Sequence, residues 1–329
     1  MSRHDACPIY ALFLNRQGGG RESGWQEIRA WRPGETILLL VSRPDGGETQ
    51  RWLKRESGLD PEVVESLLRT CNRPQCVSYK GGVLLTLRAA AYGTLHDPTV
   101  MPCVNLWIDH HRVIAIRSEP VHVFEQIRGE IAKGEGPEET GELISDVLNR
   151  LMQRLEPLLL TIGGEVDGLE DRLLMNPEAD IQQDLVTMRR KMITLRNILS
   201  PEHEAISNLL MERYSWLNES VRRRLSEINT RLHHYLAELD ATRERAMLLQ
   251  DEIMNSQTHK MNRTMKILTV ITAFLMPVNS ITSLLGTNIE GIPGQAGSGP
   301  PWGFSAEVGG LALVMLLSYI IFKRLKLFE

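Results

Sequence analysis

The stretch Ile267–Leu285, ILTVITAFLMPVNSITSLL, decides the fold of this chain, and Gly286-Thr287-Asn288 follows it directly. It carries no charged residue and is long enough to cross a bilayer as a helix. Hydroxyl and amide side chains nevertheless interrupt it, namely Thr269, Thr272, Asn279, Ser280, Thr282 and Ser283. Because lipid disfavours such polarity, one face of this helix is expected to contact protein or water.

A second apolar run, Val308–Phe322, lies close to the carboxyl end. The two runs predict transmembrane helices over residues 267–285 and 304–322, an external loop over 286–303 and a tail over 323–329. Basic residues flank the two helices on the side away from the loop: Lys260, Arg263, Lys266, Lys323, Arg324 and Lys326. By the positive-inside rule, we expect a multi-pass membrane protein with both termini in the cytoplasm.

The remaining composition indicates a large soluble body in front of this anchor. The chain has 329 residues and a formal net charge of -4, and it lacks the basic excess of a nucleic-acid-binding protein. Its first residues lack the apolar core of a secretory signal, so the amino-terminal body is expected in the cytoplasm. Its four cysteines form no CxxC pair and are expected to be reduced there.

Residues 1–118 have the pattern of a mixed α/β domain. Short apolar runs alternate with Gly, Pro and Asp, and Gly81-Gly82 between two such runs is a strong hairpin signal. His110-His111 marks a second tight turn, in which a solvent-exposed pair is favoured over a metal site. Asp60 followed by Pro61 indicates the start of a helix.

From residue 119 onward the pattern is helical. Residues 119–219 predict amphipathic helices, one of which is expected to begin at Ser200-Pro201-Glu202. Residues 220–266 contain neither Gly nor Pro, and they predict a stalk helix that continues into the first transmembrane helix. Because the soluble regions show neither a catalytic constellation nor a phosphate-binding loop, we expect no enzymatic activity and no cofactor.

A polar seam runs along the stalk and the first transmembrane helix. Steps of three and four residues back from Asn279 give a heptad pattern, which normally faces a partner helix or a shared axis. A coiled coil carries Leu and Ile at such positions, whereas this chain carries Asn279, Met276, Thr272, Thr269, Met265, Asn262, Thr258, Asn255 and Asp251. The seam therefore indicates either hydrogen bonding between helices or a water-lined path at the axis of a homo-oligomer.

The chemistry of the seam favours the water-lined path. Amide and hydroxyl oxygens can hydrogen-bond the waters of a hydrated ion, and Met276 and Met265 can form apolar constrictions. Two helices from one chain cannot enclose a channel, so several copies are required. The predicted loop has no Lys or Arg, and Glu290 and Glu307 would make an external mouth attractive to cations. A boundary position at the membrane interface explains Glu307 equally well.

These features resemble a known family. The run from Lys260 to Thr272, then Pro277 and the Gly-x-Asn at Gly286–Asn288, is similar to the carboxy-terminal core of CorA-type divalent-cation transporters. Members of that family are funnel-shaped homopentamers. The resemblance implies an α+β cytoplasmic domain, a long stalk helix and two carboxy-terminal transmembrane helices, assembled as a pentamer.

One departure from the family pattern bears on the transported ion. Magnesium-transporting members carry Gly-Met-Asn, whereas Thr287 stands at the middle position here. The zinc-transporting ZntB branch tolerates a varied middle residue and has a loop similar to residues 291–294, Gly-Ile-Pro-Gly. The resemblance implies that Gly286, Thr287 and Asn288 form a selectivity motif, in which Asn288 holds a hydrated divalent ion through its water shell.

The resemblance also implies roles for residues on the first span and the stalk. Asn279, Met276 and Thr272 would line the pore, and Asp251 stands where magnesium-transporting members place a regulatory carboxylate. An ordinary stalk salt bridge explains Asp251 equally well. Zinc prefers His and Cys ligands, which the seam lacks. The histidines on or near the stalk are expected to be ordinary surface residues: His203, His233, His234 and His259.

Three functions are compatible with the sequence. The first is a homopentamer that moves Zn2+ across the cytoplasmic membrane, which the branch resemblance implies to be uptake coupled to protons. The second is a Mg2+/Co2+ channel gated by cytoplasmic metal. The third is a membrane-tethered structural or sensory oligomer in which the seam only holds helices together. The expected partners are further copies of this chain, membrane lipid and divalent cations.

Overall fold

The computed structural model describes residues 10–34, 36–70, 73–89, 101–176, 179–285 and 303–324 of the chain. Contacts divide the chain into two compact units, Met1–Leu248 and Leu249–Glu329. The helix α8, Glu219–Leu285, is a single helix of 67 residues that contributes to both units. Within the described ranges, no helix is long and apolar enough to cross a membrane.

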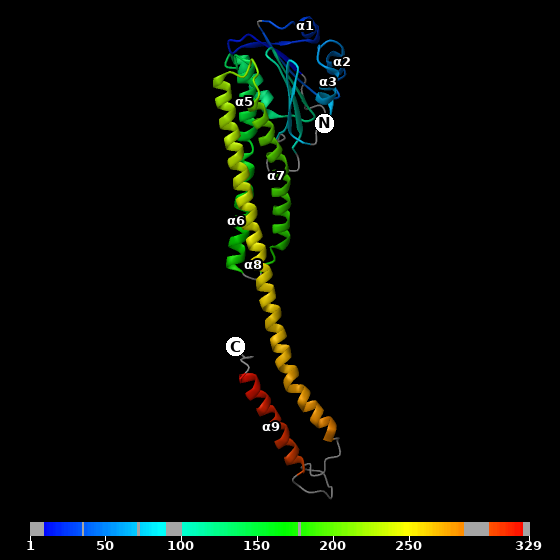
Figure 1. Ribbon diagram of the computed structural model, residues 1–329, viewed down its shortest axis with the longest axis vertical. Coiled ribbons are helices and arrows are strands. Elements are labelled where there is room, and N and C mark those ends of the chain that lie inside the picture. Colours follow the sequence, from blue (N-terminus) through cyan, green and yellow to red (C-terminus); the bar gives the residue numbers. More distant parts are fainter. Residues whose placement is uncertain are drawn as a thin grey trace. The chain divides into compact units, whose positions relative to one another are not determined.

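The first unit is built on a mixed sheet, drawn as arrows in Figure 1. It has seven strands in the order β2-β1-β3-β7-β6-β5-β4. The strands are β1 Tyr10–Leu14, β2 Gly20–Ser23, β3 Ile37–Ser42, β4 Gln75–Tyr79, β5 Gly82–Arg88, β6 Cys103–Ile108 and β7 Arg112–Arg117. The central strands β3 and β7 pair in parallel, while the other neighbours pair antiparallel. All six residues of β3 are buried, which explains why its sequence is a continuous apolar run.

Helices cover both faces of the sheet. On one face lie α1 Trp25–Ala30, α2 Gly47–Arg55 and α3 Pro61–Leu68, and their apolar residues share a core with Leu38, Leu40 and Trp107 of the sheet. The opposite face contacts α4 His122–Lys133, where the Tyr10 hydroxyl donates to the Phe124 carbonyl at 2.8 Å. The sheet is therefore the middle of three layers.

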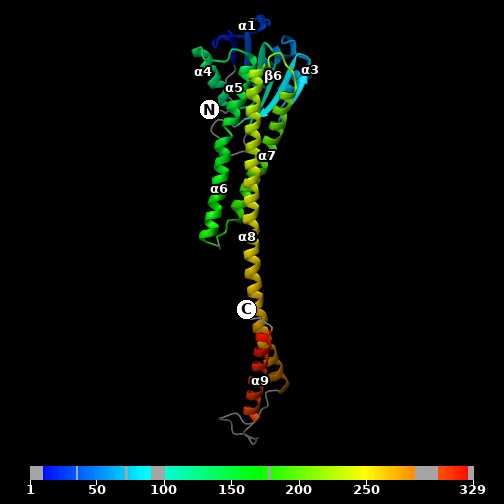
Figure 2. The same ribbon diagram turned by 60° about the vertical axis from the view of Figure 1, so that its left-hand side comes forward.

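A helical bundle completes the first unit. It contains α5 Thr140–Gln153, α6 Glu156–Met175, α7 Gln182–Met211 and α8 up to residue 248. In both views α6, α7 and this part of α8 lie side by side (Figures 1 and 2). Ion pairs tie them together at 2.7–3.1 Å, namely Arg172–Asp184, Lys191–Glu165, Arg196–Asp240 and Arg245–Asp167. The second unit adds α9, Gly303–Arg324.

The structure confirms the predicted turns and the predicted start of a helix. Gly81 adopts φ +98° between β4 and β5, a conformation that favours glycine. The Asp60 carboxylate accepts a hydrogen bond from the Glu62 amide at 3.0 Å and so caps α3. At the turn before β7, the Asp109 carboxylate accepts from the amides of His111 and Arg112, so this turn does not require a metal.

Two expectations about the first unit are wrong. No new helix begins at Ser200, because α7 continues through Pro201. A proline inside a helix removes one backbone hydrogen bond, but Leu199 and Glu202 on either side are fully buried, and this packing holds the helix together. Cys103 is disulfide-bonded, which contradicts the expectation of reduced cysteines, whereas Cys76 is free.

Candidate cation path along helix α8

The second unit exposes many large apolar side chains. On α8 these are Met254, Met261, Met265, Ile267, Leu268, Ile271, Leu275 and Met276, and on α9 they are Val308, Leu313, Met315, Leu316, Leu317, Tyr319 and Ile320. A monomeric soluble protein rarely exposes large apolar side chains in such number along its helices. Either lipid or other copies of the chain must therefore cover these residues.

The polar seam and the packed side of α8 face different directions. A stripe of half-buried residues runs along the helix, namely Val270, Ala273, Phe274, Pro277 and Val278. By contrast, every predicted pore-lining residue is exposed: Asn279, Met276, Thr272, Thr269, Met265 and Asn262. At about 100° per residue the two sets fall on different sides of the helix. The seam is therefore available to a partner helix, to water or to an ion.

Two threonines of the seam, Thr272 and Thr258, are fixed as hydrogen-bond acceptors. The Thr272 hydroxyl donates to the Leu268 carbonyl at 2.8 Å, and the Thr258 hydroxyl donates to the Met254 carbonyl at 2.9 Å. A hydroxyl has one hydrogen and two lone pairs, so this bond occupies the donor and leaves acceptor capacity. The waters around a cation turn their hydrogens outward. An oxygen that can only accept is therefore suited to a hydrated cation.

Several predicted site residues lie where the structure gives no description. Gly286, Thr287, Asn288 and Glu290 lie outside the described residues, as does the side chain of Glu307. The roles assigned to them remain predictions.

Asp251 is exposed on α8. Within the described part of the chain it takes part in neither an ion pair nor a hydrogen bond. Among the described residues, Asp251 therefore has no partner for a stalk salt bridge within one chain. The carboxylate is available to a second chain or to a cation.

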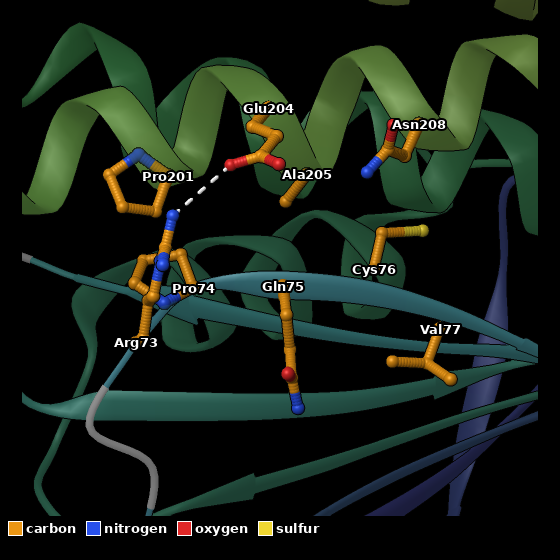
Figure 3. Close-up of a pocket in the computed structure, with 9 residues that line it drawn as sticks. All are labelled: Arg73, Pro74, Gln75, Cys76, Val77, Pro201, Glu204, Ala205 and Asn208. Atoms are coloured by element: carbon orange, nitrogen blue, oxygen red, sulfur yellow. Dashed lines mark hydrogen bonds and ion pairs between the residues drawn. The ribbon is translucent and has the colours of Figure 1, made fainter.

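The first unit contains a cavity of about 260 Å³ between β4 and α7 (Figure 3). Arg73 reaches across it to Glu204 on α7, with a nitrogen–oxygen distance of 3.3 Å. Burial raises the pKa of the Cys76 thiol in this cavity to about 12. The thiol therefore stays protonated near neutral pH and lacks the thiolate that a nucleophile or metal ligand needs. Nothing in this cavity indicates catalysis.

A match to a family of metal-ion transporters defines the class of this protein. Residues 37–324 match the family described as "CorA-like Mg2+ transporter protein". This match covers most of the chain, and the chain belongs to that family.

Two relatives show how far the similarity extends. The divalent cation transporter CmaX of Pseudomonas aeruginosa is 31% identical over 322 residues, which cover 97% of this chain and 96% of CmaX. The zinc transport protein ZntB of Yersinia enterocolitica is 26% identical over 309 residues, which cover 94% of this chain and 92% of ZntB. The similarity is therefore not limited to the carboxy-terminal core.

Solved structures agree with this assignment. Full-length CmaX matches with a TM-score of 0.81 at 30% identity, covering 97% of both chains. The CorA magnesium transporter of Methanocaldococcus jannaschii matches with a TM-score of 0.74, covering 96% of this chain and 98% of that chain. At 16% identity the latter shows the fold alone. The family resemblance and the α+β domain with a long helix are thus confirmed. The expectation that the chain is not an enzyme is confirmed as well, since the family is one of transporters.

Proposed function

We propose that this chain is one subunit of a homopentameric transporter that moves divalent cations, with Zn2+ as the principal ion, across the cytoplasmic membrane. In this proposal residues 267–285 and 304–322 cross the membrane, and five copies of the α8 seam line an axial path. The apolar length of the first segment is complete only with residues whose side chains lie outside the description, such as Ile281 and Leu284. One observation carries the proposal: the exposed, acceptor-rich seam lies on a different side of α8 from the half-buried stripe.

The exposed apolar side chains of α8 and α9 supply the membrane contact in this proposal. On α9 the exposed apolar side chains, from Val308 to Ile320, point in several directions around the helix, as expected for a helix in contact with lipid. Lys266 precedes the first segment and Arg324 follows the second, so in this proposal both basic residues lie on the same side of the membrane. This distribution supports a cytoplasmic location of both termini.

Zinc crosses this path with most of its hydration shell, because the seam offers oxygen and thioether groups and neither imidazole nor thiolate. Asn288 holds the hydrated ion at the external mouth, where Glu290 and Glu307 add negative charge. The names of the relatives support a divalent cation, and ZntB among them supports zinc. Uptake coupled to protons is part of the proposal because the resemblance to the ZntB branch implies it. Residues 267–285 contain no ionisable side chain, so the proton moves by another route.

A Mg2+/Co2+ channel gated by cytoplasmic metal is the second candidate. The description of the family names Mg2+, and Asp251 is an exposed carboxylate without a partner among the described residues. Magnesium prefers oxygen ligands and keeps several waters, which the seam can accommodate.

The decisive experiment measures flux into liposomes that contain the purified full-length protein. A zinc-sensitive dye reports Zn2+ entry with and without a pH gradient, and parallel assays measure Mg2+ and Co2+. We expect Zn2+ flux that increases when protons move in the same direction. Mg2+ flux without Zn2+ flux would reject zinc and leave the second candidate. Protein without any divalent flux would instead be the structural or sensory oligomer.

Two variants test the path itself. We expect Asn288→Ala to reduce divalent flux, and intact flux would remove Asn288 from the path. We expect the Asn279→Cys variant to be labelled by a thiol reagent that is too polar to enter lipid. The labelling should exceed that of the parent protein. Protection of this cysteine in the assembled protein would mean that the seam is a dry helix contact.

A further inference from the structure

Two histidines from different helices meet on the surface of the first unit. His203 lies on α7 and is half-buried, and His233 lies on α8 and is exposed. Their ring centroids are 5.6 Å apart with an interplanar angle of 41°. The residues are 30 positions apart in sequence, so the fold alone brings the two imidazoles together.

Contacts on both sides of the pair fix its position. One turn along, the Asn229 side-chain amide donates to the Ser207 hydroxyl at 3.0 Å. On the other side, the Arg196 guanidinium pairs with Asp240 at 2.7 Å. These contacts set the antiparallel register of α7 and α8 above and below the two rings. The proximity of His203 and His233 is therefore a property of the helix pairing.

The ring nitrogens of this pair form no hydrogen bond among the described residues. Burial lowers the pKa of His203, and the nearby His233 lowers it further. Both effects favour neutral imidazole at His203 near neutral pH, which is the form that binds a metal ion.

The other neighbouring histidines of the first unit are arranged differently. In the turn before β7, the rings of His110 and His111 are 4.6 Å apart, but Ser215 and Arg16 contact their nitrogens at 3.5 Å. His234 follows His233 directly, yet its ring lies 6.4 Å away.

The spacing of His203 and His233 fits two ligands of one metal ion. A zinc–nitrogen bond of about 2.0–2.1 Å places each ring centroid roughly 3 Å from the metal, and a tetrahedral angle then separates the centroids by about 5 Å. A small rotation of the exposed His233 ring closes the remaining difference from 5.6 Å.

We propose that His203 and His233 bind one borderline divalent transition-metal ion, Zn2+ or Co2+, which bridges α7 and α8. Within the described residues no cluster of three or more His, Cys, Asp or Glu is placed to hold a metal. Water therefore completes the coordination shell, and the ion exchanges readily with solution. Mg2+ does not bind here, because it prefers oxygen ligands. The site is separate from the α8 seam and stands whether or not the proposed transport is correct.

The test uses the full-length protein in detergent and Co2+ as a spectroscopic probe, with Zn2+ as the competitor. The variants are His203→Gln, His233→Gln and, as a matched control on the same helix, His234→Gln. Loss of a second-shell partner typically weakens metal binding by 10–100-fold, so loss of a ligand is expected to weaken Co2+ binding at this site by about tenfold or more. His234→Gln is expected to bind as the parent does, and Mg2+ is not expected to compete.

Thermal unfolding provides a second measurement. A metal that binds only the folded chain raises the melting temperature in a concentration-dependent manner. We expect Zn2+ to raise the melting temperature of the parent and of His234→Gln, and to do so less for the other two variants. Equal metal binding by all four proteins would overturn the inference, as would an effect of only one of the two ligand substitutions. Unchanged flux in His203→Gln liposomes would separate this site from the proposed transport.

Discussion

The two units of the molecule treat polar side chains in opposite ways. In the first unit several buried polar side chains form hydrogen bonds within the chain, as where the Ser42 and Thr49 hydroxyls meet at 2.5 Å. In the second unit the polar residues of the seam are exposed, and Thr272 bonds only to its own helix among the described contacts.

This difference shows that polar side chains have two distinct roles in the molecule. An unpaired polar group inside a core costs free energy, so buried polar residues are bonded and thereby specify one fold. Polar residues on the outside of an apolar helix have no such role within the chain. Their position is explained by what they contact outside it, which in our proposal is hydrated cation.

The largest effect is expected at the seam. The double variant Thr272→Val and Asn279→Leu removes acceptors from the path, and we expect divalent flux in liposomes to fall by at least about tenfold, equivalent to about 1.4 kcal/mol or more on the barrier. Thr264→Val is the matched control, because Thr264 forms the same bond to the carbonyl four residues earlier, at 3.0 Å, on another side of α8. Equal losses of flux in both proteins would indicate that flux depends on the polarity of α8 in general and not on the seam.

The next effect concerns stability of the first unit. The Asn105 side-chain amide donates to the carbonyls of Leu67 and Arg69 at 2.9 Å, at the end of α3. Asn105→Ala leaves these carbonyls unsatisfied, and we expect a loss of about 2–4 kcal/mol in the free energy of unfolding. Urea unfolding followed by tryptophan fluorescence measures this, since five of the six tryptophans belong to the first unit: Trp25, Trp31, Trp52, Trp107 and Trp216. Unchanged stability would mean that water replaces the amide.

A pH-dependent effect of similar or smaller size is expected at Glu202. This side chain is fully buried, and one oxygen accepts a hydrogen bond from the Arg88 amide at 2.7 Å. Burial raises its pKa from 4.5 to about 8. The folded chain therefore keeps a proton that the unfolded chain releases, so the free energy of unfolding falls as pH rises from about 4.5 to about 8.

Glu202→Gln cannot release a proton, and we expect it to reduce this slope, by up to about 1.4 kcal/mol per pH unit. Glu204→Gln, two residues further on the same helix and mostly exposed, is expected to retain the slope. Urea unfolding at several pH values distinguishes the two. Identical pH profiles for both variants would show that Glu202 titrates normally.

The smallest effect is expected for the ion pair across the cavity. Arg73 and Glu204 keep 71% and 65% of their side chains exposed. Water screens such a pair, so Arg73→Ala should change the free energy of unfolding by less than about 1 kcal/mol. A larger loss in the same urea assay would show that Arg73 is more than a surface residue.

Much of the fold follows from local sequence patterns. The hairpin at Gly81-Gly82, the cap at Asp60 and the continuous helix up to Leu285 are each encoded by neighbouring residues. The short elements β2 and α1 are not predicted. The residues of β2 are polar and pair only with β1, and α1 has six residues, of which Ile28 is the buried one. Pro201 leads to a wrong prediction, the start of a new helix. The packing around it keeps α7 continuous despite this strong local signal.

The candidate path is predictable in part. A heptad count finds the seam, because helix periodicity places its members on one side. The count does not find the half-buried stripe from Val270 to Val278, since apolar residues occur all around this part of α8. The pairing of His203 with His233 is likewise invisible in the sequence, because it depends on how α7 packs against α8.

The bond between the Thr272 hydroxyl and the Leu268 carbonyl has one more consequence, which concerns the sign of the ion. An anion needs hydrogen-bond donors, and a hydroxyl whose hydrogen is held by its own helix offers none. In the proposed oligomer, a ring of such threonines would therefore disfavour chloride or phosphate without any fixed charge. Since mobile ions screen charges far more than they alter a short hydrogen bond, exclusion of anions at this ring should persist at high ionic strength.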